Sequence, residues 1–65
     1  MVTKIKVLLD QKGISQSSLA RLCGIDVYRL NRYVTGAARP GLKSLQRMAT
    51  ALGVSIHEIS EVGHE

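Results

Sequence analysis

A single glycine, Gly24, separates two stretches with helical periodicity, residues 16–23 and residues 26–35. Helices joined by so few residues cannot pack antiparallel and must cross at a steep angle. Such a crossing needs a very small side chain where the second helix passes the first, and Ala20 meets that need. The turn needs a residue that tolerates positive φ, which Gly24 does, and an apolar side chain beneath it, which Ile25 provides. This spacing predicts a helical corner.

The apolar positions on either side of this corner fit the same geometry. Leu19 and Cys23 face the second helix, and Leu30 and Tyr33, about one turn apart, face the first. Together with the small residue, the glycine and the apolar turn residue, they predict a helix-turn-helix over residues 16–35. The alternative is an ordinary helical corner with no role in binding DNA.

Glycines and capping residues divide the whole chain into short helices. The predicted helices are Thr3–Lys12, Ser15–Cys23, Asp26–Gly36, Leu42–Leu52 and Ser55–Ser60, with a loop at Gly36–Gly41. Besides the corner residues, those expected to face inward are Ile5, Leu8, Leu9, Leu22, Leu42, Leu45, Met48, Ala49, Leu52, Ile56 and Ile59. Ser55 and Glu58 match a capping box. No strand pattern competes, so the predicted fold is all-α, five short helices in one domain, 1–65.

Composition argues against several classes of protein. Cys23 has no second cysteine to pair with, and one unpaired cysteine suits a reducing cytoplasm better than secretion. His57 and His64 lack the spacing of metal ligands. The N-terminus has too few apolar residues for a signal peptide, and no run approaches the roughly 18 apolar residues of a membrane span. We therefore expect no metal, no cofactor, no small-molecule ligand and no membrane partner.

Charge is distributed unevenly along the chain. Residues 1–47 contain all nine Lys and Arg residues and only two acidic residues, so their net charge is +7. Residues 48–65, which end in the short acidic tail 61–65, hold the other three acidic residues and carry −3. A basic body indicates a polyanion as partner, and the alternative is a surface that only keeps the protein soluble.

Two stretches, KGISQSSLARLCGID and YRLNRYVTGAARPGLKSLQRMATALGVSIHEI, carry the motifs of a known family. The motifs are Ser15-Gln16, Leu19-Ala20, Gly24, the spacing from Gly36 to Pro40, and the run from Ala51 to Ser55. On these residues the chain resembles the lambda-repressor-like helix-turn-helix family of the Cro/XRE type, over residues 3–60. The resemblance implies a five-helix DNA-binding domain whose third helix enters the major groove.

One departure from the family pattern concerns an ion pair. The family often pairs an arginine late in the first helix with a glutamate near the end of the third. Those positions are Leu9 and Val34 here, so both partners are apolar. Losing one partner would leave a buried charge at a cost of about 3–5 kcal/mol, whereas replacing both is often neutral or stabilising. The predicted fold is therefore unaffected.

The outer face of the third helix carries the residues expected to read bases. Stepping about 100° per residue from Leu30 places Tyr28 and Arg32 on the opposite side of the helix, with Arg29 and Asn31 on its shoulders. Arginine can pair with guanine and asparagine with adenine in the major groove. The predicted base-reading residues are Val27, Tyr28, Arg29, Asn31 and Arg32. The two arginines could instead contact phosphate alone.

A second set of residues is expected to bind phosphates. Gln16 opens the second helix, where first-turn amides and a polar side chain can meet a phosphate, and the resemblance implies a phosphate-contacting glutamine at this position. The full predicted set is Gln16, Ser17, Arg21, Thr35, Arg39 and Lys43. Arg21 has the alternative of a solvated face.

No enzymatic site is expected, because no nucleophile, base and orienting group converge in the sequence. A single small module buries too little surface for strong specific binding. We therefore expect a homodimer on a two-fold symmetric DNA operator, with Val54, Ile59 and Val62 at the dimer surface; in the alternative, these residues only finish the core of a monomer.

The expected function is sequence-specific double-stranded DNA binding by a small transcriptional repressor that occludes a promoter in a bacterial or phage-encoded, cytoplasmic setting. A helix-turn-helix module that binds mainly another protein, of the antitoxin or coactivator type, stays open as the alternative.

Overall fold

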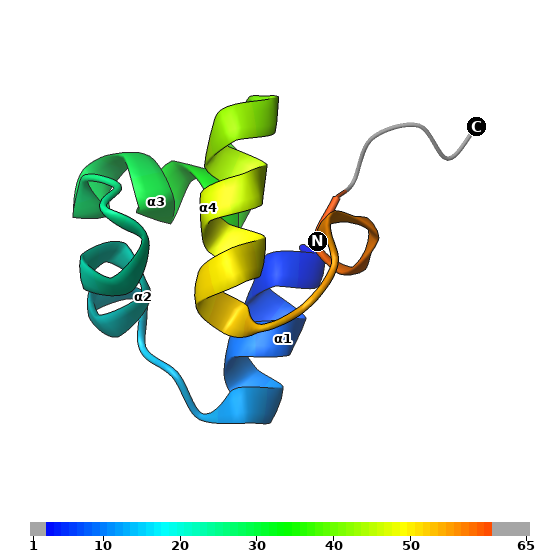
Figure 1. The fold of residues 1–65 in the computed structure, drawn as a ribbon. Helices are drawn as coiled ribbons and strands as arrows, with labels where there is room; N and C mark the ends of the chain where they lie inside the picture. The colour runs from blue at the N-terminus through cyan, green and yellow to red at the C-terminus, as the bar shows by residue number, and fades with distance from the viewer. Residues whose placement is uncertain (1–2, 61–65) are drawn as a thin grey trace.

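The computed structural model describes residues 3–60 and is all-helical over that range. Four α-helices, α1 (Lys4–Lys12), α2 (Gln16–Cys23), α3 (Val27–Thr35) and α4 (Leu42–Leu52), are followed by a single 3-10 turn, η1 (Ile56–Glu58). Figure 1 shows α2 and α3 together on one side of α4, with η1 on the other side. The predicted bounds of the four α-helices are confirmed to within a residue, because caps and glycines fix both ends of each helix.

The first three helices begin at side-chain caps. Thr3 accepts from the backbone N–H of Lys6, Ser15 accepts from that of Ser18, and Asp26 accepts from two first-turn amides of α3. These caps satisfy backbone donors that have no partner within a helix. The helix starts are therefore local properties of the sequence.

Gly24 ends α2 with a φ of 71°, in the left-handed region that L side chains rarely adopt. Its amide and that of Ile25 both donate to the carbonyl of Ala20, at 2.9 and 3.2 Å. These two bonds close the turn, and α3 begins at Val27, three residues after Gly24.

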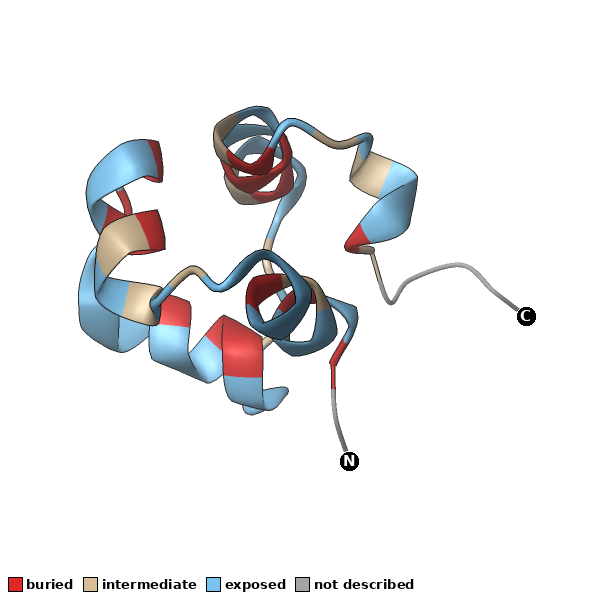
Figure 2. Cartoon of the chain, turned by 90° about the horizontal axis from the view of Figure 1, so that it is seen from below, coloured by how far each residue is buried: buried red, intermediate tan, exposed pale blue. Residues whose placement is uncertain are grey.

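The core lies where the helices face one another (Figure 2). Packing joins α2 to both α3 and α4, α1 to α3, and α4 to η1. The buried apolar residues are Ile5, Leu9, Leu19, Ala20, Cys23, Ile25, Leu30, Tyr33, Val34, Leu45, Met48, Ala49, Leu52 and Ile59. The corner residues Leu19 and Leu30 have no accessible surface, so the helix-turn-helix is part of the core.

The apolar pair at the family's ion-pair positions is buried, with both Leu9 and Val34 at 2% exposure. Beside it, the Thr3 hydroxyl donates to the carbonyl of Val34 at 2.6 Å and ties the start of α1 to the end of α3. Neither Leu9 nor Val34 carries a charge, so neither needs an ion-pair partner in the core.

Two expectations about the core were wrong, and the fifth helix is shorter than expected. Leu22 and Leu42 are 64% and 65% exposed. Leu22 lies on the flank of the stripe formed by its buried neighbours in α2, and Leu42 precedes the first buried residue of α4 by nearly a turn. The fifth helix is only the three-residue η1, although the Ser55–Glu58 capping box is present as predicted.

No helix within residues 3–60 is long and apolar enough to cross a membrane.

Candidate nucleic-acid interface

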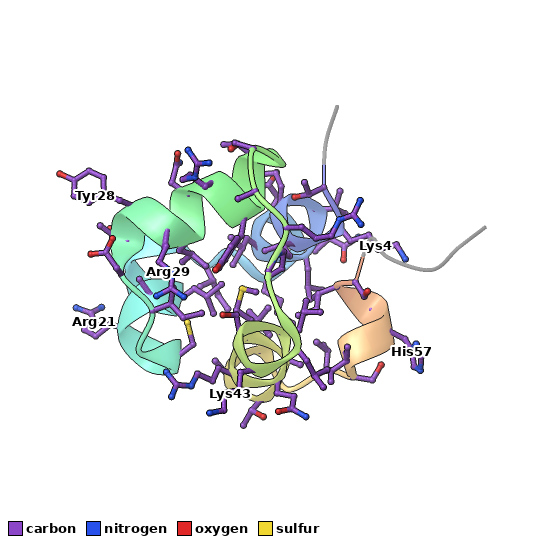
Figure 3. The ribbon with its side chains drawn as sticks, turned by 90° about the horizontal axis from the view of Figure 1, so that it is seen from above. Lys4, Arg21, Tyr28, Arg29, Lys43 and His57 are labelled. Atoms are coloured by element: carbon purple, nitrogen blue, oxygen red, sulfur yellow. The ribbon has the colours of Figure 1, made fainter. Side chains whose placement is uncertain are left out.

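The outer face of α3 is arranged as its periodicity predicts. Leu30, Tyr33 and Val34 are buried, and the five predicted base-reading residues are all exposed. Tyr28 has 80% of its surface accessible and points away from the molecule in Figure 3. A convex helical face with protruding side chains, held on a rigid core, has the shape that a major groove admits.

The start of α3 is occupied by Asp26. One oxygen of its carboxylate accepts from the backbone N–H of Tyr28 at 3.0 Å and from that of Arg29 at 3.3 Å. These two amides are therefore not free to bind a phosphate, and recognition by α3 depends on its side chains.

Arg29 and Tyr33 lie about one turn apart on α3. Hydrogen bonding from Arg29, and next from Ser44 of α4, lowers the pKa of the Tyr33 hydroxyl, against the opposing effect of burial. Tyr33 thus lies in the core with its hydroxyl at the rim, where it joins α3 to α4. Arg29 is exposed on a shoulder of α3, close enough to lower this pKa.

A hydrogen bond between side chains connects α2 and α3 on their outer faces. Asn31 Nδ2 donates to Gln16 Oε1 at 3.0 Å, over a separation of 15 residues. The structure therefore brings together one predicted base-reading residue and one predicted phosphate-binding residue. Sequence reasoning placed both residues near DNA but gave no sign of this contact.

The remaining predicted phosphate-binding residues are exposed and come from three helices and one loop. They are Ser17 and Arg21 on α2, Thr35 at the end of α3, Arg39 in the loop and Lys43 on α4. The Thr35 hydroxyl donates to the carbonyl of Arg32 at 3.4 Å. In Figure 3, Arg21 lies on the same side of the molecule as Tyr28 and Arg29, whereas Lys4 and His57 lie on the opposite side.

Arg47 on α4 was missed by the sequence analysis. Its Nη1 lies 4.0 Å from the position that a Cβ would take on Gly24, so its guanidinium reaches the turn between α2 and α3. The signal in the sequence was the spacing of Lys43 and Arg47, which are four residues apart on one helical face. This pair adds positive charge beside the helix-turn-helix.

Other chemistry-bearing groups lie away from this face. No group of three or more His, Cys, Asp or Glu residues that could hold a metal occurs within residues 3–60. Cys23 is buried and its thiol contacts the Ala20 carbonyl at 3.9 Å. Lys6 is paired with Asp10 at 3.1 Å on the surface of α1, and His57 is exposed on η1.

The residues expected at a dimer surface have different environments. Val54 is partly buried and packs against the core. Ile59 is only 1% exposed and completes the core of a single chain, so its side chain has no surface to present to a partner. Val62 and the acidic tail 61–65 lie outside the described residues.

Known proteins share this arrangement. A model of the helix-turn-helix family matches residues 5–59. The solved structure of the restriction-modification controller protein C.AhdI from Aeromonas hydrophila is similar, with 31% sequence identity and a TM-score of 0.80 over 85% of this chain and 83% of that chain. No curated protein sequence matches the chain. The family match includes the whole of α2, α3 and α4, the helices that carry the basic face.

Proposed function

We propose, from the premise that this chain belongs to the Cro/XRE-type helix-turn-helix family and is a DNA-binding transcription regulator, that it recognises a specific duplex sequence. In this proposal α3 lies in the major groove. The observation that carries it is the exposed face of α3, where polar and basic side chains stand directly opposite the buried Leu30 and Tyr33.

The base-reading set is Val27, Tyr28, Arg29, Asn31 and Arg32, drawn from the first two turns of α3. Residues near the start of a recognition helix reach base edges. Arg32 can donate two hydrogen bonds to guanine O6 and N7, and Val27, which is 40% exposed, can contact a thymine methyl. Arg29 lies close to the Tyr33 hydroxyl, whose pKa it lowers.

Phosphate contacts surround this helix on both sides. Gln16 and Ser17 at the start of α2 contact phosphates of one DNA strand. Thr35 at the end of α3 and Arg39 in the following loop contact phosphates of the other strand. Arg21, Lys43 and Arg47 extend the positive surface beside the turn. Such contacts fix the orientation of the protein on the duplex without specifying its sequence.

We further propose that the protein acts as a homodimeric repressor in a bacterial or phage-encoded, cytoplasmic setting. Two copies related by two-fold symmetry would contact half-sites about 34–36 Å apart, and occupation of a promoter would exclude polymerase. The surface around Val54 and η1 is the proposed dimer contact. Because Ile59 is buried, it supports this surface from beneath.

Selection of bound duplexes from a random library, at near-physiological salt, tests the proposal. A basic surface binds any DNA at low ionic strength, so only selection at near-physiological salt distinguishes sequence-specific binding from general attraction to DNA. The expected result is a two-fold symmetric motif with half-sites one helical turn apart. Enrichment of no sequence, with binding that disappears on adding salt, would contradict it and favour a protein partner.

A further inference from the structure

We propose that Tyr33 is a positioning residue for DNA recognition: its hydroxyl holds the guanidinium of Arg29, and Ser44 of α4 holds the hydroxyl. This inference rests on the proposed function and deepens it, because it names the group that orients one of the base-reading side chains. It starts from the placement of three polar groups, two on α3 and one in the first turn of α4.

The geometry of α3 directs Tyr33 at Arg29. The two residues are four apart, so their side chains lie on one face of the helix. Long side chains on a helix lean toward its N-terminus and cover the turn before their own Cα, so the ring of Tyr33 extends toward Arg29. Tyr33 is buried, at 8% exposure, whereas Arg29 is exposed. The tyrosine is therefore the fixed member of this pair.

The hydroxyl of Tyr33 lies at the rim of the core, where it meets groups from two helices. Hydrogen bonding from Arg29 and from Ser44 lowers its pKa, because donors to the phenolic oxygen stabilise the ionised form. A phenolic oxygen can accept as well as donate. Ser44 is half-buried at the start of α4, so it ties the polar end of Tyr33 to a second helix.

Arg29 has no acidic partner within residues 3–60. Asp26 lies three residues before it but accepts from backbone N–H groups at the start of α3. In Figure 3, Tyr28 points away from the molecule, whereas the side chain of Arg29 lies within its outline. Tyr33 is therefore the group that determines where the side chain of Arg29 lies before DNA binds.

A guanidinium held by Tyr33 can still read a base. Arginine has five N–H donors, of which a bond to Tyr33 uses one and a contact with guanine O6 and N7 uses two. The guanidinium is planar and rigid, so a bond to one donor limits the directions of the others. An arginine that is oriented before DNA arrives also loses less side-chain freedom on binding.

A double-mutant cycle on the duplexes of the library selection tests this proposal. Arg29→Ala should lose discrimination at one base pair and bind the preferred duplex about 5- to 150-fold more weakly, the range for one bidentate base contact. Tyr33→Phe keeps the buried ring and removes only the hydroxyl. It should reduce discrimination at that same base pair and weaken binding by about 2- to 10-fold, the range for one hydrogen bond. The double variant should be no weaker than Arg29→Ala alone, because Tyr33 acts through Arg29.

Three further variants separate orientation from charge and from folding. Arg29→Lys keeps the charge but lacks the planar group, so it should keep the salt dependence of binding and lose the discrimination. Ser44→Ala should change preference at the same base pair as Tyr33→Phe, to a smaller degree; an unchanged preference would remove α4 from the proposal. Thr50→Ala is the matched control, since it removes an exposed hydroxyl from a later turn of α4, and it should bind DNA as the unaltered protein does. Thermal unfolding establishes that each variant is folded.

Three results would overturn the inference. Discrimination by Tyr33→Phe equal to that of the unaltered protein would mean that the hydroxyl does not orient Arg29. Losses that add in the double variant would mean that Tyr33 acts independently of Arg29. A loss in Arg29→Ala that is equal on every duplex would make Arg29 a phosphate contact, with no base reading for Tyr33 to orient. All three differ from failure of the proposed function, in which the unaltered protein itself shows no preference among duplexes.

Discussion

Replacement of Asp26 separates two effects of its carboxylate at the start of α3: it caps the helix, and its negative charge repels DNA phosphates. That carboxylate accepts from the backbone N–H groups of Tyr28 and Arg29, at 3.0 and 3.3 Å. It thus satisfies two of the four donors that have no partner in the first turn. Asp26→Ala removes both bonds and should cost about 1 kcal/mol of folding stability. In a domain of this size, that loss lowers the Tm by about 4–8 °C.

Asp26→Asn is the matched variant, because it keeps an oxygen that can cap the helix and removes only the charge. Asparagine caps as well as aspartate, so the remaining loss is the interaction with the helix dipole, about 0.3–1 kcal/mol. DNA binding should improve. At an assumed separation of about 8 Å, a carboxylate and a phosphate would repel each other by about 0.5 kcal/mol in water, so removal of the charge should give roughly twofold tighter binding at low salt.

Thermal unfolding followed by circular dichroism and titration of a labelled duplex measure the two effects. Asp10→Asn is the control for the charge change, because Asp10 is exposed on α1 and paired with Lys6. If Asp26→Asn destabilised the protein as much as Asp26→Ala, the two hydrogen bonds would not be holding the start of α3. If it bound duplex no more tightly than Asp10→Asn does, the start of α3 would not lie near the phosphates.

Two further predictions concern the core and its rim. In a Tyr28→Phe variant, absorbance titration should show Tyr33 ionising below its ordinary pKa of 10.0, chiefly because of the hydrogen bond from Arg29; a pKa that Arg29→Ala fails to raise would contradict this. Leu9→Arg or Val34→Glu alone should cost about 3–5 kcal/mol in urea unfolding, since each leaves a buried charge unpaired, whereas the two together should recover most of that loss. A double variant as unstable as the sum of the two would show that these side chains do not meet.

The helix boundaries were predictable because each one is determined by residues close to it in the sequence. Asp26 caps α3 through amides only two and three residues away, and Gly24 adopts a backbone conformation that other residues rarely do. The corner was also predictable, since Ala20 and Ile25 must fit a space defined by the turn itself. These features need no knowledge of the rest of the chain.

Burial was less predictable. Periodicity shows which face of a helix is apolar, but it does not show how much of that face a neighbouring helix covers. Leu22 and Leu42 match the apolar pattern but lie beyond the reach of the packed helices. Ile59 was expected both to face inward and to lie at a dimer surface, and the structure buries it in the core. The extent of each contact depends on tertiary packing, which the sequence does not specify residue by residue.

The contacts within the candidate interface were the least predictable part. Asn31 and Gln16 are 15 residues apart, and their hydrogen bond exists only because the helices cross at one particular angle. Arg47 reaches the turn at Gly24 from a third helix. The residue types on the face of α3 were sufficient to predict DNA binding, but the contacts among these side chains required the structure.

The central claim is that side chains on the outer face of α3 specify the DNA sequence. Binding of the unaltered protein and of Arg32→Ala should be compared across duplexes that vary each base pair of the selected motif, with Gln16→Ala as the phosphate-contact control. We predict that Arg32→Ala loses about 1–3 kcal/mol on the preferred duplex and loses discrimination at one base pair, while Gln16→Ala weakens binding to every duplex alike. An equal loss on all duplexes for Arg32→Ala would contradict the claim and reduce Arg32 to a phosphate contact.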